Sequence, residues 1–183
     1  MRYVAATLVA SALAALPAPA PGASEFAAPT EYQVKAAFLY NFAKFVEWPD
    51  AQPRAPFVIG VLGDDPFGPV LDQTVTGKTV LSRPLAVRRL ADAADAPQVD
   101  ILFIAASERA RLPEVLRRLR GANVLTVGDT ENFVGRGGMV GFRIAGNTVR
   151  FDINLREATR AGLRISSQLL RLAGRVVPVE EPR

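Results

Sequence analysis

The sequence predicts an α/β protein: a three-layer α/β/α sandwich whose mostly parallel sheet is followed by a C-terminal β-hairpin plus helix. Two observations support this fold class. Short apolar segments alternate along the chain with segments of helical periodicity, an order that places helices on both faces of a parallel sheet. Near the C-terminus, two segments of alternating polarity flank Gly146-Asn147, a two-residue loop suited to a tight hairpin.

The first residues indicate an export signal. An almost unbroken run of Ala, Val and Leu extends from Tyr3 to Leu16, after the positive charge of Arg2. This run is shorter than the roughly 20 apolar residues that span a bilayer, and small, turn-forming residues follow it. We therefore expect residues 1–24 to be a cleaved signal peptide, with the cut just after Ala23 or Ser24.

The remainder, residues 25–183, is expected to form a single exported domain with its core at about 31–177, because it contains no repeat, low-complexity segment or internal linker. The chain has no cysteine and no histidine. Ser-His and Cys-His catalysis, zinc fingers and thiol redox chemistry are thereby excluded. Neither a calcium-loop pattern nor a nucleic-acid motif occurs. We expect no metal, no cofactor, no nucleic-acid partner and no enzymatic activity.

The first predicted helix extends from Glu31 to Glu47, with Thr30 as its N-cap and Pro49 just beyond its end. Its apolar face carries Val34, Phe38, Phe42 and Phe45, and Leu39 and Val46 extend this face. Lys35 and Asn41 fall within or beside this face, where a buried polar group needs a partner. Two alternatives stay open: Lys35 extends its amine to solvent while Asn41 holds a neighbouring loop, or both line a binding cleft.

The middle of the chain alternates strands and helices. In order, we expect a strand at Phe57–Leu62, a helix from the Asp64-Asp65-Pro66 cap to about Thr74, short strands at Val80–Ser82 and Leu85–Val87, a strand at Asp100–Ala105, a helix around Pro113–Arg120 and a strand at Val124–Val127. Continuous apolar strands such as Asp100–Ala105 are typical of a parallel sheet buried on both faces.

The predicted hairpin pairs Met139–Ala145 with Thr148–Leu155, and its polar face carries Arg143, Arg150 and Asp152. In this register Arg143 lies opposite Arg150, and directly opposed like charges destabilise a strand pair. Either Asp152 relieves this repulsion, or the arginines await an acidic ligand or partner.

The last predicted helix extends from Leu155 to Ala173, capped by Asn154. One of its faces carries the arginines Arg156, Arg160, Arg164 and Arg171. Such a stripe is either a solvated face or a second candidate surface for recognition.

No motif points to catalysis. Gly60-Val61-Leu62-Gly63 lacks the spacing of a nucleotide-binding loop. Asp64 and Asp65 are explained by helix capping and by the proline that follows them.

The segment Tyr32–Pro49, YQVKAAFLYNFAKFVEWP, resembles the opening signature of the YfiR family. Later blocks resemble the same family in the same order: Ile59–Gly68, Asp100–Ala105, Val124–Asp129, Gly137–Met139 and Arg150–Leu155. The resemblance implies a periplasmic repressor that binds the periplasmic sensory region of an inner-membrane diguanylate cyclase of the YfiN type, lowers cyclic di-GMP and biofilm formation, and pairs as a homodimer. It also implies disulfide-linked redox control in some relatives, which a chain without cysteine cannot have.

The candidate partner- or ligand-binding residues are Lys35, Asn41, Trp48, Arg143, Arg150, Asp152 and Arg164. The alternative function is a periplasmic sensor domain that binds a small molecule in a cleft at the strand ends and acts on another membrane signalling protein.

Overall fold

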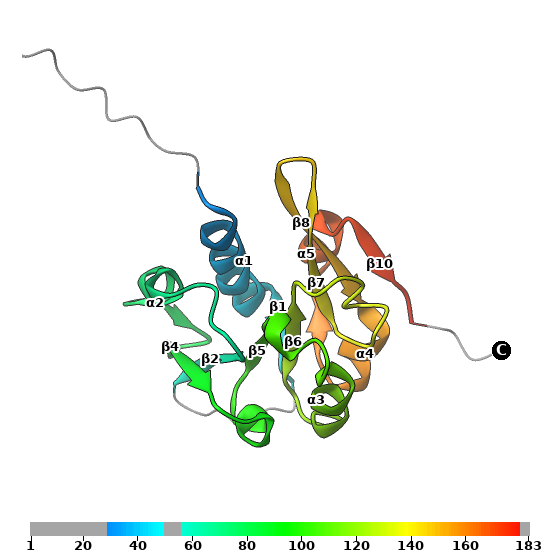
Figure 1. The fold of residues 1–183 in the computed structure, drawn as a ribbon, viewed down its shortest axis with the longest axis horizontal. Helices are drawn as coiled ribbons and strands as arrows, with labels where there is room; N and C mark the ends of the chain where they lie inside the picture. Colours follow the sequence, from blue (N-terminus) through cyan, green and yellow to red (C-terminus); the bar gives the residue numbers. More distant parts are fainter. Residues whose placement is uncertain (1–28, 50–55, 180–183) are drawn as a thin grey trace, which may run out of the picture.

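A computed structural model describes residues 29–49 and 56–179, so the predicted signal peptide lies outside the described residues. In chain order the elements are α1 (Glu31–Phe45), β1 (Val46–Glu47), β2 (Phe57–Leu62), α2 (Pro69–Val75), β3 (Thr79–Val80), β4 (Arg83–Leu90), the 3-10 helix η1 (Ala93–Gln98), β5 (Ile101–Ile104), the 3-10 helix η2 (Ala106–Glu108), α3 (Leu112–Arg118), β6 (Leu125–Gly128), β7 (Val140–Ala145), β8 (Thr148–Asn154), α4 (Leu155–Arg160), β9 (Arg164–Ile165), α5 (Ser167–Leu172) and β10 (Arg175–Val177) (Figure 1).

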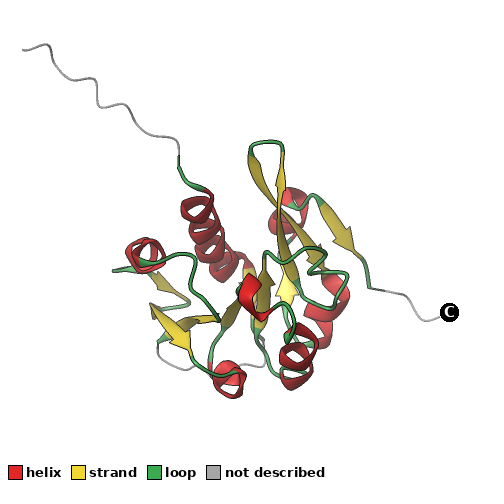
Figure 2. Cartoon of the chain, viewed as in Figure 1, coloured by secondary structure: helices red, strands yellow, loops and turns green. Residues whose placement is uncertain are grey.

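The predicted α/β fold with a mostly parallel sheet is confirmed. The eight-stranded sheet has the order β10-β8-β7-β6-β5-β2-β4-β3, and a small second sheet pairs β1 with β9. Neighbours in the large sheet are parallel except for β7–β8 and β3–β4. Helices lie on both sides of the strands (Figure 2).

Two apolar clusters cover the two faces of this sheet. One joins α1 and α2 to the strands through fully buried side chains such as Phe42, Ile59 and Phe103. The other joins η1 and α3 to the opposite face through Ala96, Leu102 and Leu112. Alternate residues of one strand therefore enter different clusters, as expected for a sheet buried between two helical layers.

The first helix begins as predicted. Thr30 and Gln33 form a reciprocal capping box, in which each backbone N–H donates to the other residue's side chain. The predicted end at Glu47 is wrong, because α1 ends at Phe45 and the next two residues pair with β9. This pairing is a long-range contact, which helical periodicity does not reveal.

The second helix begins later than predicted. Asp65 accepts a hydrogen bond from the Phe67 backbone N–H at 2.8 Å, which makes a turn instead of a helix cap. The helix starts at Pro69, after Gly68 at φ +53°. The first turn of the helix therefore does contain a proline, as predicted, but this proline is Pro69 and not Pro66.

The single last helix predicted for Leu155–Ala173 is wrong. The chain forms α4, β9, α5 and then β10, which pairs parallel with β8 as an additional strand. Gly162 at φ +73° ends the first helical segment, and the Ser166 side chain caps the second by accepting from the Leu169 N–H. The four arginines consequently share no single helix face.

A substitution at Gly162 distinguishes the observed break from the continuous helix, because the two arrangements predict changes of opposite sign in the unfolding free energy. In the observed left-handed conformation, Gly162→Ala should lower the unfolding free energy by about 1–2 kcal/mol. In a continuous helix the same change would raise it by about 1 kcal/mol. Urea denaturation with Thr159→Ala as the control distinguishes them, and a stabilised Gly162→Ala variant would contradict the break between α4 and β9.

Candidate functional site

Lys35 lies at the centre of a charged cluster between α1 and the end of β6. Its side chain is only 3% exposed, and its Nζ lies 2.6 Å from Asp129 Oδ2 and 2.5 Å from Glu31 Oε1. The Nζ also lies 4.4 Å from the centroid of the Tyr32 ring. The interpretation that Lys35 extends its amine to solvent is therefore wrong, because buried carboxylate pairing holds the amine inside.

The cluster favours the charged form of the lysine. Burial by itself would lower the pKa of Lys35, but hydrogen bonds to Asp129 and Glu31 outweigh burial, so the pKa is raised. Burial, followed by the negative charge of Asp129, raises the pKa of Tyr32. At neutral pH Lys35 is therefore an ammonium and Tyr32 a neutral phenol, and both contact Asp129.

Asp129 is the residue that sequence reasoning missed. Its Oδ2 accepts from Lys35 and, at 3.1 Å, from the Tyr32 hydroxyl. Its Oδ1 is buried and has no hydrogen-bond partner among the described residues. The available signal was an acidic residue directly after a buried parallel strand, because the carboxyl ends of such strands are where α/β sheets bind ligands.

Phe133 anchors the segment that follows Asp129 against the sheet. Its side chain is 2% exposed. A Cβ atom at Gly128 or Gly138 would overlap the Phe133 ring, so both positions require glycine. Residues 129–134 are thereby held next to β7.

The hairpin has the predicted register, with Arg143 opposite Arg150. Asp152 relieves the repulsion: its Oδ1 accepts from Arg143 Nε at 3.1 Å, and its Oδ2 lies 3.7 Å from Arg175 Nε on β10. Arg150 is exposed and makes no ion pair or side-chain hydrogen bond within residues 29–49 and 56–179. Asp152 therefore neutralises Arg143, whereas the guanidinium of Arg150 is available for an acidic group from outside the described residues.

A pocket of about 590 Å³ lies between residues 129–134 and the β7, β8 and β10 strands. Asp129, Arg143 and Asp152 all line it, with Arg175. The structure therefore brings two predicted site residues, Arg143 and Asp152, next to the carboxylate that pairs with Lys35. Charges of both signs face one cavity.

The other predicted site residues lie elsewhere. Trp48 is 8% exposed and packs edge-on against Phe57 at 5.1 Å between ring centroids. Arg164 lies opposite Glu47 in the small β1–β9 sheet. Asn41 is partly exposed on α1, and its side chain makes no hydrogen bond to another described residue. These three residues do not line the pocket beside Asp129.

The adjacent carboxylates Asp64 and Asp65 have separate structural contacts, and the Asp64 backbone N–H donates to Ser107 Oγ at 2.9 Å. Asp65 Oδ2 lies 2.9 Å from Arg89 Nε, and the same guanidinium reaches Asp72. The hydrogen bond from Arg89 lowers the pKa of Asp72.

Among the described residues, no three Asp or Glu side chains are grouped as metal ligands. The same part of the chain contains no helix of the length and apolarity needed to cross a membrane.

Comparison with known proteins identifies a family and a fold. A family model described as YfiR/HmsC-like matches residues 32–174. No curated protein matches the chain. A conserved domain protein from Vibrio cholerae O1 biovar El Tor strain N16961 is similar with a TM-score of 0.55 and 12% identity, covering 80% of this chain and 60% of that one. The ABC domain in complex with L-Trp from Streptococcus pneumonia has a TM-score of 0.47 and 13% identity, covering 65% of this chain and 54% of that one.

The chain thus spans less than two thirds of either solved structure. At such low identity the likeness to the Vibrio cholerae structure concerns the fold alone.

Proposed function

The chain belongs to the YfiR/HmsC-like family, and from this premise we propose that it is a negative regulator that binds the periplasmic sensory region of an inner-membrane diguanylate cyclase and represses cyclic di-GMP synthesis. The match over residues 32–174 carries the proposal and agrees with the resemblance of Tyr32–Pro49. Family membership indicates a periplasmic regulatory role in cyclic di-GMP signalling. The YfiN-like partner, repression and biofilm control are the proposed part.

Export belongs to the same proposal. We propose that residues 1–24 are removed as a signal peptide and that the processed protein works in the periplasm as a homodimer. Binding, without catalysis, is supported by a sequence that offers neither histidine nor cysteine for acid–base or nucleophilic chemistry.

The polar face of the hairpin is the proposed recognition surface. Arg150 is exposed there without a neutralising partner among the described residues, whereas Arg143 is already paired with Asp152. An exposed guanidinium beside a rigid sheet is suited to an acidic group on a protein partner, because electrostatic complementarity directs binding and its rate.

Arg150→Glu tests this surface while both members of the Arg143–Asp152 pair stay in the chain. The variant should fold normally, because Arg150 is exposed and unpaired within the described chain. We expect at least about tenfold weaker capture of the membrane cyclase, because the reversed charge repels an acidic partner. Cellular cyclic di-GMP should rise accordingly.

The matched control is Arg88→Glu. Arg88 is an exposed arginine on β4, near the opposite edge of the large sheet from β8. It should leave capture and cyclic di-GMP unchanged. Full capture by a folded Arg150→Glu variant would place the interface elsewhere. Recovery of a different class of membrane sensor, with no cyclase, would favour the small-ligand sensor function.

A further inference from the structure

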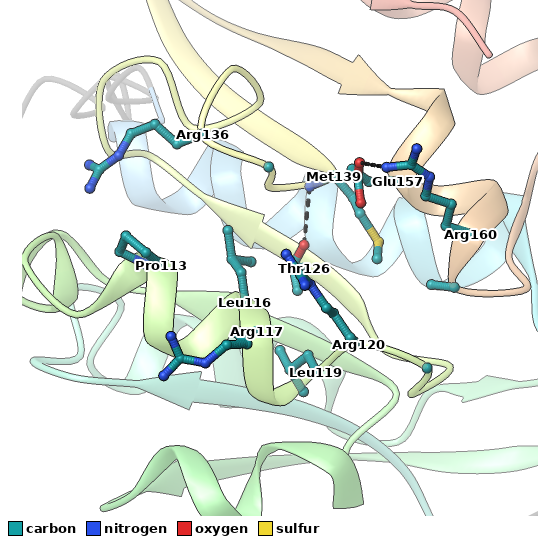
Figure 3. A pocket seen from close by; sticks show the side chains of 13 residues that line it. Pro113, Leu116, Arg117, Leu119, Arg120, Thr126, Arg136, Met139, Glu157 and Arg160 are labelled. Carbon is teal, nitrogen blue, oxygen red and sulfur yellow. Dashed lines mark hydrogen bonds and ion pairs between the residues drawn. The ribbon is translucent and has the colours of Figure 1, made fainter. Parts of the chain in front are cut away.

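A second pocket has a different chemistry, and none of the polar hairpin residues Arg143, Arg150 and Asp152 lines it. It occupies about 640 Å³, a volume typical of small-molecule sites. Figure 3 shows it beside α3, over β6, with α4 on its other side. Its apolar lining comes from Pro113, Leu116, Leu119, Met139 and Ala161.

The charged lining of this pocket is predominantly positive. Four arginines, Arg117, Arg120, Arg136 and Arg160, line it with a single carboxylate, Glu157. That carboxylate already accepts a hydrogen bond from Arg160 Nη1 at 2.8 Å. Arg136 donates to the Arg109 backbone carbonyl at 2.9 Å. The pocket therefore has an excess of cationic donors.

Arg120 and Thr126 provide two donors that other residues leave unused. Arg120 is directed over the pocket in Figure 3, whereas Arg117 and Arg136 are directed away from it. In the described part of the chain, no residue forms an ion pair or side-chain hydrogen bond with Arg120. Thr126 is 1% exposed and its Oγ1 accepts from the Met139 N–H at 3.1 Å. Its own hydroxyl hydrogen therefore stays available, because a threonine hydroxyl both accepts and donates.

We propose that this pocket binds a small amphipathic carboxylate. The carboxylate accepts from the Arg120 guanidinium and the Thr126 hydroxyl, and the apolar body lies against Leu116 and Met139. A charge-assisted hydrogen bond to a guanidinium is stronger than one between neutral groups, so the anionic group sets the specificity. This site is independent of the hairpin surface and of the proposed partner.

Octanoate is the probe, with octylammonium and 1-octanol as ligands of the same length and different charge. The chain contains two methionines, Met1 and Met139, so a methyl-labelled sample gives a direct signal from the pocket. Octanoate should shift the Met139 methyl resonance and bind at least about tenfold more tightly than octylammonium, because a guanidinium repels an ammonium. Raising the salt concentration should weaken octanoate binding more than 1-octanol binding, because salt screens exposed charges.

Arg120→Gln should raise the Kd for octanoate at least about tenfold, since it removes the charged donor while keeping much of the side chain. Arg118→Gln is the control: this arginine is the last residue of α3, two positions before Arg120, pairs with Glu114 and does not line the pocket. It should leave the Kd unchanged. The proposal is overturned if octanoate leaves the Met139 signal unmoved, if octylammonium binds equally well, or if Arg120→Gln binds octanoate like the unmodified protein.

Discussion

Replacing Lys35 by methionine is expected to lower the free energy of unfolding by roughly 3–5 kcal/mol, because it leaves the buried Asp129 carboxylate without its counter-charge. Lys35 is 3% exposed and Asp129 10% exposed at the side chain, so water compensates little of the lost pairing. Urea denaturation at neutral pH measures the loss. A loss below about 1 kcal/mol would show that the ion pair contributes little to stability.

Two variants separate the ion pair from the helix itself. Lys44→Met removes an exposed lysine from the same helix and should change the unfolding free energy by less than about 0.5 kcal/mol. Lys35→Met combined with Asp129→Asn removes both charges and should recover most of the loss, because no unpaired charge is then buried.

The Lys35 contribution has a defined pH dependence. The folded pKa of Lys35 is raised above its ordinary value, so the stabilisation is fully present below the unfolded pKa of about 10.4 and is lost as pH rises through the folded value. The pKa of Tyr32 is raised too and acts in the same direction. The difference between the unmodified protein and Lys35→Met should therefore stay constant from neutral pH to about pH 10 and shrink as pH rises through the raised folded pKa of Lys35.

Phe42→Ala is expected to lower the unfolding free energy by about 3–5 kcal/mol, because it leaves a cavity at the junction of α1 with the hairpin. Phe42 is fully buried, and its ring centroid lies 5.8 Å from that of Phe142 and 5.2 Å from that of Phe151. Chemical denaturation measures the effect. A small loss with unchanged cooperativity would mean that α1 does not dock on β7 and β8 in solution.

Phe38→Ala is the comparison within the same aromatic cluster. Its ring centroid lies 5.2 Å from that of Phe151, but the side chain is only partly buried. We expect a loss of about 2 kcal/mol, smaller than that of Phe42→Ala, because less apolar surface returns to water.

The local sequence pattern was sufficient to predict a structural element wherever the residues that stabilise that element are close together in the chain. Alternating polarity on both sides of Gly146-Asn147 predicted the hairpin register, because a one-residue slip would expose the whole apolar face. Buried strands such as Ile101–Ile104 followed from continuous apolar runs. The prediction of one helix at the end of the chain was wrong for a local reason. Gly162 ends one helix and Ser166 begins the next, inside an apolar stripe that looks continuous.

The sequence by itself determined the α/β class, the hairpin and the resemblance to a family, since these depend on residues that are neighbours in the chain or form one continuous segment. Only the tertiary structure decided that Lys35 pairs with Asp129, 94 positions away, that β1 pairs with β9, and that β10 lies beside β8. The physical reason is that the order of strands in a sheet brings distant segments together. A charged residue on a helix face shows that it needs a partner, but sheet order selects which one.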